Sequence, residues 1–272
     1  MSIYFHKSFY KSFGTFPLQG DTVRAAIADA LSVGYRAFDT AQMYENESEV
    51  GEMLDTSSIP KNELLITTKV SIKNFEESQF FKSVETSLNK LRVSQVDVLL
   101  LHWPPYGGDI VPSIKLLQQA HERKLAKHIG VSNYTVSMLK TALEILEVPI
   151  VTNQVEFHPL LDQSKLLAVS SKLGVPITSY CSLARGKVFQ ETQLDDIAKH
   201  YGRSVSQIVL QWILQKGVAT TVMSSKYKNI HDNFAISDFV LSSVDMAKID
   251  RLGSLNYRIV DKQIVPWAPD WD

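Results

Sequence analysis

The chain has 272 residues, of which 44% are hydrophobic and 21% are charged, as in an ordinary globular protein. Its 28 Lys and Arg residues nearly cancel its 29 Asp and Glu residues, which argues against nucleic acid or an anionic membrane as the main partner. The single cysteine, Cys181, excludes an intrachain disulfide and suits a reducing compartment. No apolar run is long enough for a membrane helix, and residues 1–12 lack the apolar core of a signal peptide. We therefore expect one cytoplasmic domain over residues 1–272, working as a monomer.

Short apolar runs alternate with amphipathic segments along the whole chain. The run at 96–101 is almost unbroken apolar, as expected of a strand that is covered on both faces. Eight such runs are predicted to be strands: residues 12–16, 35–38, 64–68, 96–101, 128–131, 151–155, 177–179 and 218–223.

Helices are predicted between these strands. Asp21 is expected to cap the first helix and Gly34 to end it. The third carries one apolar stripe of Phe80, Val84, Leu88 and Leu91. The predicted helices cover 22–32, 47–53, the stripe at 80–91, 113–123, 136–146, 164–173, 194–215 with a break near Gly202, 229–234 and an extra one at 243–252.

Eight strands alternating with helices favour an α/β fold of the (β/α)8 TIM barrel type, with the extra C-terminal helix outside the repeat. A doubly wound sheet is the competing architecture. It usually carries a G-x-G-x-x-G turn after its first strand, and the segment around Phe13-Gly-Thr-Phe16 has only one glycine.

In a barrel, the carboxyl ends of the strands form the working face. Asp39, Lys69 and His102 stand at the ends of three neighbouring predicted strands, and Tyr44 lies in the loop after Asp39. Taken alone, each has a structural explanation: a buried histidine for His102, an ion pair for Asp39 and Lys69, and a surface phenol for Tyr44. The set is more informative, because barrel geometry lets all four side chains meet.

Together these four side chains suit proton donation to a developing alkoxide. A phenol is a weak acid unless its anion is stabilised, and the ammonium of Lys69 is expected to lower the pKa of Tyr44. Asp39 would keep Lys69 charged and oriented, while His102 would hydrogen-bond the substrate oxygen. The sequence shows no metal cluster, activated nucleophile or phosphate-binding glycine loop, so an external hydride donor is expected to supply the electrons.

Five segments around these residues form a family pattern: Gly34-Tyr-Arg-Ala-Phe-Asp-Thr-Ala41 with Tyr44-Glu-Asn-Glu47, Ile66-Thr-Thr-Lys69, Val96-Asp-Val-Leu-Leu-Leu-His-Trp-Pro104, Ile129-Gly-Val-Ser-Asn-Tyr134 and Thr152-Asn-Gln-Val-Glu-Phe-His-Pro159. In these segments the chain resembles the aldo-keto reductase family, over roughly residues 12–272. Within that family, the short loop after Trp103 and the ending Trp267-Ala-Pro-Asp-Trp-Asp272 are similar to the B-type bacterial 2,5-diketo-D-gluconate reductases.

The resemblance implies NADPH-dependent reduction of aldehydes and ketones, such as methylglyoxal and keto sugars including 2,5-diketo-D-gluconate. It makes Tyr44 the general acid, tuned by Lys69 and Asp39, with His102 orienting the carbonyl. It implies cofactor contacts from Thr15, Asp39, Ser132, Asn133, Gln154, Tyr180 (stacked on the nicotinamide), Leu183, Arg185 and Asn233. The expected substrate pocket is lined by Phe16, His102, Trp103, Trp267 and Trp271.

The chain departs from the family pattern where the ribose phosphate of NADPH is held. Ser224 stands in place of the usual lysine, and Asn229 in place of the usual arginine. Lys226 and Lys228, with a hydrogen bond from Ser225, can replace them, because phosphate favours charge-assisted donors. Both lysines are equally compatible with a solvated surface.

Two other functions stay open at this point. Some barrels of this family act mainly as cofactor-holding binding proteins with slow turnover. A hydrolase or isomerase could also reuse the four residues, but it would need a second carboxylate near the site. Glu156 is the one candidate, and we expect it to pair locally.

Overall fold

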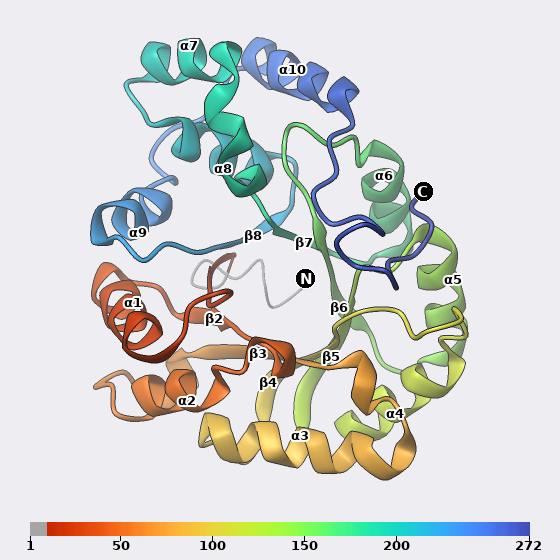
Figure 1. Cartoon of the computed structure of the whole chain (residues 1–272). Coiled ribbons are helices and arrows are strands. Elements are labelled where there is room, and N and C mark those ends of the chain that lie inside the picture. The colour runs from red at the N-terminus through yellow and green to blue at the C-terminus, as the bar shows by residue number, and fades with distance from the viewer. Residues whose placement is uncertain (1–9) are drawn as a thin grey trace.

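Eight parallel strands close into a barrel in the computed structural model, which describes residues 10–272 (Figure 1). Each strand pairs with the next along the chain, and β8 pairs with β1 to complete the ring. The predicted TIM barrel is therefore confirmed. The expectation that the first residues form no signal peptide concerns mainly residues 1–9, which lie outside the described residues. The strands are β1 (Lys11–Gly14), β2 (Ala37–Asp39), β3 (Leu65–Val70), β4 (Val96–Leu101), β5 (Ala126–Ser132), β6 (Ile150–Glu156), β7 (Ile177–Tyr180) and β8 (Ala219–Val222).

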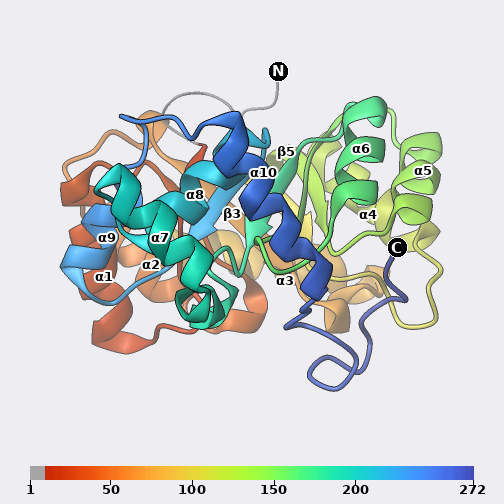
Figure 2. The ribbon, with the colours of Figure 1, turned by 90° about the horizontal axis from the view of Figure 1, so that it is seen from above.

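Helices surround the barrel, and the views along and across it show them as an outer layer (Figures 1 and 2). None of those within residues 10–272 is long and apolar enough to cross a bilayer. They are α1 (Gly20–Val33), α2 (Glu47–Asp55), α3 (Glu77–Leu91), α4 (Val111–Glu122), α5 (Val136–Ile145), α6 (Ser164–Leu173), α7 (Thr192–Tyr201), α8 (Val205–Gln215), α9 (Tyr227–Phe234) and α10 (Ser243–Arg251).

The strands are rich in apolar residues because they are buried. The main hydrophobic core lies between strands and helices, where the predicted stripe of α3 is buried. A small second cluster fills the barrel interior, formed by Ala37, Leu65, Val98, Leu100 and Ala219. Because β4 contributes to both clusters, its sequence is apolar on both faces.

Several element boundaries differ from the predictions. Asp21 does not cap α1: the helix begins at Gly20, and the Asp21 carboxylate lies 3.3 Å from Arg24 instead. Strand β1 ends at Gly14, whereas residue 16 was predicted as its end. Pro17 follows shortly after and has no N–H to donate to a neighbouring strand. The predicted break near Gly202 is confirmed, since α7 ends there and Ser204 starts α8 with a capping box.

The loop after β2 is fixed by close packing of the helix that follows it. Gly51 in α2 lies against the last turn of α3, where an added Cβ would come within 2.2 Å of the carbonyl oxygen of Lys90. Only glycine permits this approach. Helix α2 therefore sits close to α3, and its N-terminal end holds the short helix η2 (Gln42–Tyr44) over the barrel mouth.

The C-terminal segment leaves the outer layer and returns to the barrel mouth. Helix α10 packs beside α7, as the extra helix expected from the sequence (Figure 1). After η6 (Leu252–Leu255) the chain runs back along the barrel face in both ribbon views (Figure 2). The backbone N–H groups of Ile259 and Val260 donate to the carboxylate of Glu156, at 2.7 and 2.8 Å. This anchors the tail over the end of β6.

Candidate active site

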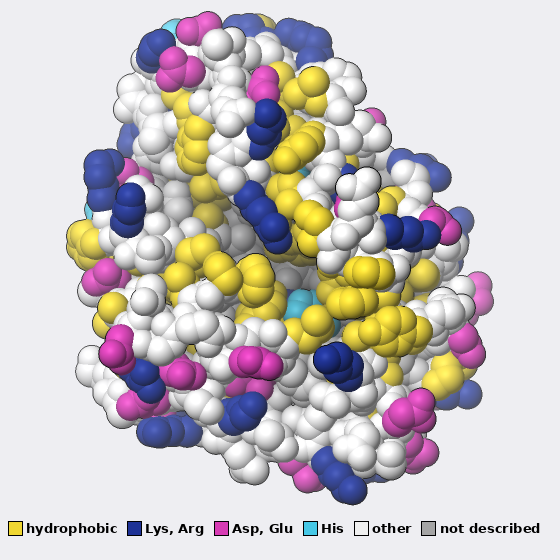
Figure 3. Space-filling view, in the orientation of Figure 1, with side chains coloured by type: hydrophobic (Ala, Val, Ile, Leu, Met, Phe, Trp, Pro, Cys, Tyr) yellow, Lys and Arg dark blue, Asp and Glu magenta, His cyan; other side chains and the backbone are white. Residues whose placement is uncertain are grey.

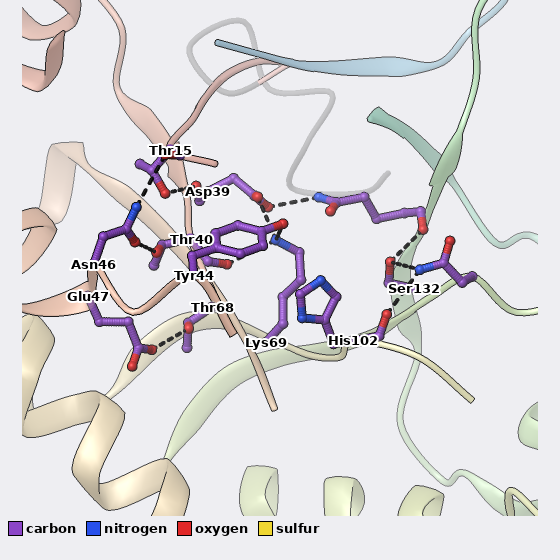
Figure 4. A network of polar contacts seen from close by, with 12 residues as sticks. Thr15, Asp39, Thr40, Tyr44, Asn46, Glu47, Thr68, Lys69, His102 and Ser132 are labelled. Carbon is purple, nitrogen blue, oxygen red and sulfur yellow. Dashed lines mark hydrogen bonds and ion pairs between the residues drawn. The ribbon is translucent and has the colours of Figure 1, made fainter. Parts of the chain in front are cut away.

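The four strand-end side chains singled out from the sequence meet at the barrel mouth (Figure 4). Asp39 ends β2, Lys69 lies near the end of β3, and His102 follows β4, while Tyr44 comes from η2. The ammonium nitrogen of Lys69 lies 2.5 Å from Asp39 Oδ1 and 3.3 Å from the hydroxyl of Tyr44. The rings of Tyr44 and His102 meet edge to face, with centroids 5.4 Å apart.

Lys69 is fully buried, with 0% of its surface exposed. Its ammonium also donates to the backbone carbonyl of Thr40 at 2.9 Å. Burial alone would lower the pKa of Lys69, but the charge of Asp39 and the contact with Tyr44 outweigh burial and raise it. Lys69 is therefore a permanent cation beside the phenol.

The acidity of Tyr44 differs from the expectation. Burial raises the pKa of Tyr44 above its usual value, and the opposing effect of Lys69 does not cancel that shift. The reason is that a phenolate loses more solvation in this pocket than one ammonium, itself neutralised by Asp39, restores. Tyr44 consequently stays protonated at neutral pH, which is the state a proton donor needs.

His102 is neutral in this site. Burial, with a further contribution from the Lys69 charge, holds the pKa of His102 well below its usual value. Its Nδ1 is buried and has no hydrogen-bond partner within residues 10–272. A neutral imidazole carries one ring N–H, which can donate a hydrogen bond to a ligand oxygen.

Asn46 holds the loop that carries Tyr44. Its side chain is fully buried, and its amide donates to the carbonyls of Thr15 and Leu18 at 3.2 and 2.9 Å, while its oxygen accepts from Thr40 at 2.7 Å. The loops after β1 and β2 are thereby joined by one side chain (Figure 4).

Three further side chains fix the same loop. Gln19 donates to the Tyr44 carbonyl at 2.6 Å. Gln42 accepts from the backbone N–H of Ser71 at 2.8 Å. Glu47, buried at the start of α2, accepts from the Thr68 hydroxyl at 2.6 Å, and burial raises its pKa. Sequence reasoning missed these supports, although Asn46 and Glu47 belong to the quoted Tyr44 segment.

A polar network links Asp39 to the strands across the barrel. Gln154 donates to Asp39 Oδ2 at 2.8 Å. Ser132 donates to the Gln154 carbonyl at 2.7 Å, and Tyr180 donates to Asn133 Oδ1 at 2.7 Å. Gln154 and Tyr180 line the cavity, whereas Ser132 and Asn133 hydrogen-bond to them without lining it.

A cavity of about 630 Å³ opens beside this network, within the range typical of ligand sites. Its lining combines the amide of Gln154 and the hydroxyl groups of Tyr44 and Tyr180 with the charge of Arg185, which are groups that can bind a nicotinamide and a phosphate. Arg185 belongs to η5 (Ala184–Gln190), where its φ of 48° marks a kink. The residues lining the cavity include Thr15, Asp39, Tyr44, Gln154, Tyr180, Cys181, Leu183 and Arg185.

The segment expected to hold the ribose phosphate follows the cavity wall at the end of β8. Ser224 accepts from the backbone N–H of Lys226 at 3.2 Å, and Ser225 is exposed beside it. Lys228 is bound to Asp232, one turn along α9, at 2.5 Å. Asn229 is exposed and Asn233 is buried. Lys226 is therefore the lysine without an ion pair in this stretch.

Aromatic side chains border the mouth on the other side. Phe16 packs on Tyr44 with ring centroids 5.1 Å apart, and Trp103 meets Trp271 of the tail at 6.3 Å. Trp267 meets Tyr106 at 6.0 Å, a residue that the sequence reasoning did not include. Figure 3 shows hydrophobic side chains gathered around a central hollow in which a histidine is visible.

Glu156 has no free oxygen for chemistry. One oxygen accepts from the Ile259 N–H and from His158 at 2.9 Å, and the other accepts from the Val260 N–H. It pairs locally, as expected, and its role is to anchor the tail. Across residues 10–272, no cluster of His, Cys, Asp and Glu is arranged to hold a metal ion.

Comparison with known proteins finds relatives that are reductases or oxidoreductases. The model of the aldo/keto reductase family matches residues 11–254. Methylglyoxal reductase DkgB of Yersinia pestis is 36% identical over 262 residues, covering 95% of this chain and 97% of the relative. The "uncharacterized oxidoreductase YtbE" of Bacillus subtilis is 34% identical, covering 89% of this chain and 87% of the relative.

Solved structures agree with this grouping. A crystal structure described as "a putative 2,5-diketo-D-gluconic acid reductase B" superposes with a TM-score of 0.94 at 38% identity, covering 100% of this chain and 97% of the other. An aldo-keto reductase of Bombyx mori in complex with NADP gives a TM-score of 0.88 at 26% identity, covering 97% and 94%.

Proposed function

Since the chain belongs to the aldo/keto reductase family and is an NADP-dependent oxidoreductase, we propose that it reduces small polar aldehydes and ketones to alcohols, with Tyr44 as the proton donor. The substrates we propose are methylglyoxal and keto sugars such as 2,5-diketo-D-gluconate, the compounds named for two of its relatives. The observation that carries the proposal is the contact of Lys69 with both Asp39 and Tyr44 beside a neutral His102.

Each of the four residues has one task in this reaction. NADPH supplies the hydride when it is bound. Tyr44 gives its hydroxyl proton to the carbonyl oxygen, and the phenolate that remains is stabilised by the ammonium of Lys69. Asp39 keeps that ammonium charged and in place. His102, being neutral, donates a hydrogen bond to the same carbonyl oxygen and orients the substrate.

We propose that residues of the cavity and of the segment after β8 would hold the cofactor. Tyr180 would stack on the nicotinamide, and Gln154 would bind its carboxamide, with Ser132 and Asn133 behind it. Arg185, which lines the cavity, would bind the phosphates. Lys226 is the proposed partner of the ribose phosphate, with hydrogen bonds from Ser224 and Ser225 and with Asn229 and Asn233 nearby in α9.

A steady-state assay that follows NADPH absorbance tests this proposal directly. With methylglyoxal or 4-nitrobenzaldehyde, the enzyme should oxidise many equivalents of NADPH per protein. A single burst without turnover would instead identify a cofactor-holding binding protein. Conversion of substrate without NADPH would contradict the hydride mechanism.

We also propose that the protein works as a monomer in the cytoplasm. The free thiol of Cys181 and the near-balanced charge support this location. All four proposed catalytic residues come from one chain, so the site needs no second copy. Light scattering should give a molar mass near 30.6 kDa; twice that value would contradict the proposal.

A further inference from the structure

Arg258 is a cation without a counter-ion at the barrel mouth. Within residues 10–272 its guanidinium has no ion pair, and Nη1 is buried without any hydrogen-bond partner. Burial lowers the pKa of Arg258, and the surrounding groups oppose that effect only in part. A charged side chain is rarely buried without a partner, because desolvation costs more than packing returns. Arg258 therefore lacks an anionic partner that would offset the desolvation of its guanidinium.

The neighbouring carboxylates do not fill that role. Glu156 uses both oxygens for the backbone of Ile259 and Val260. Asp272 accepts from the backbone N–H of Val136 at 2.8 Å and so caps the start of α5. Both act on Arg258 through their electrostatic field, but neither forms an ion pair with it among the described residues.

Arg258 borders the substrate side of the site. Its guanidinium carbon lies 4.1 Å from the ring centre of Trp271, which in turn packs against Trp103 next to His102. Arg258 also acts electrostatically on Tyr180, which lines the cavity. Although Nη1 is buried, Arg258 as a whole residue is only half-buried, so a dissolved ligand can reach its side chain.

Other unpaired donors lie in the same tail. Trp271 Nε1 and Trp267 Nε1 are both buried without a hydrogen-bond partner in the described part of the chain. Buried indole N–H groups normally find an acceptor. A group that offers several acceptor positions and a negative charge would satisfy the arginine and an indole together. A carboxylate has these properties, and its plane matches the guanidinium fork.

We infer that Arg258 binds the carboxylate of the substrate, so that this reductase prefers carbonyl compounds that also carry an acid group over neutral ones. The inference rests on the proposed carbonyl reduction and names the class of compound that the site selects. Contacts of the tail fix the position of Arg258. Glu156 accepts hydrogen bonds from the two residues that follow Arg258, and Asp272 accepts one from the backbone of Val136.

A binding titration tests this role without turnover. Benzoate and benzamide, a matched charged and neutral pair, are titrated against the NADP-saturated protein while tryptophan fluorescence is followed. Benzoate should bind more tightly than benzamide. Arg258→Gln should weaken the binding of benzoate by about ten- to a hundredfold, which corresponds to the loss of a charge-assisted hydrogen bond. Arg258→Lys should recover part of the loss. Equal affinity of benzoate for wild type and Arg258→Gln would overturn the inference.

A second experiment, which measures turnover of two aldehydes, separates this inference from the proposed function. The ratio of kcat/KM for 4-carboxybenzaldehyde to that for 4-nitrobenzaldehyde should fall about ten- to a hundredfold in Arg258→Gln. Arg251→Gln, which removes an exposed arginine of α10, is the control and should keep the wild-type ratio. An equal loss for both aldehydes, or weaker NADPH binding in Arg258→Gln, would show a structural or cofactor role instead. If neither aldehyde is reduced by wild type, the proposed function fails, while the titration still decides the role of Arg258.

Discussion

The ammonium of Lys69 lies 3.3 Å from the hydroxyl of Tyr44. The contact opposes the effect of burial on the phenol without cancelling it, so the pKa of Tyr44 stays above its usual value. The pair thus keeps the proton on Tyr44 at rest and places a positive charge where the phenolate would form. Both features favour proton donation in the direction of carbonyl reduction.

The pKa directions predict a broad pH profile for carbonyl reduction. In the proposed mechanism, reduction needs Tyr44 protonated, and its raised pKa means that activity is lost only as pH rises beyond about 10. It also needs His102 neutral, and the lowered pKa means that activity is lost only as pH falls well below about 6.5. The kcat/KM measured with a neutral aldehyde should therefore be flat between these limits. A titration centred near pH 6.5 would contradict the neutral histidine.

Asn46 is predicted to act through Tyr44 as a positioning residue. Asn46→Ala removes the three hydrogen bonds that join the loops after β1 and β2. We expect kcat to fall about tenfold or more while KM for NADPH changes little, because misplacing a donor group raises the barrier. The free energy of unfolding should fall by about 1–3 kcal/mol.

Asn62→Ala, at an exposed position, is the matched control for this substitution and should change neither quantity. Circular dichroism at the assay temperature checks that Asn46→Ala is folded. If the folded variant retained the wild-type kcat, the loop contacts would serve stability alone.

The lysines after β8 are predicted to differ in their effect on cofactor choice. Lys228 is tied to Asp232, whereas Lys226 has no ion pair in this stretch. Lys226→Ala should weaken the binding of NADPH by about tenfold and leave the binding of NADH nearly unchanged, because only NADPH carries the ribose phosphate. Lys228→Ala should change the NADPH-to-NADH ratio little. Dissociation constants for both cofactors decide the matter; an unchanged ratio in both variants would remove the phosphate assignment.

The fold and the meeting of the four residues were predictable because they follow from local pattern and barrel symmetry. Apolar runs such as that of β4 show buried strands, and strand ends of a barrel lie on one face. Asp39, Lys69 and His102 stand directly at such ends, so their proximity needed no knowledge of loops.

The parts that depended on tertiary context were not predictable. The pKa of Tyr44 is decided by how deeply the phenol is buried, which no spacing shows. Arg258 is distant in sequence from Trp103 and reaches the mouth because Glu156 and Asp272 anchor the tail. Asp21 illustrates the same limit at a helix end: α1 begins at Gly20, so Asp21 lies inside the first turn and cannot be its N-cap.

The most direct test of the account is the turnover of Tyr44→Phe, which removes only the proposed proton donor. The rate of NADPH oxidation with 4-nitrobenzaldehyde should fall by about 10²–10⁴-fold, the usual contribution of general acid catalysis, while the NADPH dissociation constant stays close to that of wild type. A Tyr44→Phe enzyme that retained a tenth of the wild-type kcat would show that the proton comes from another group.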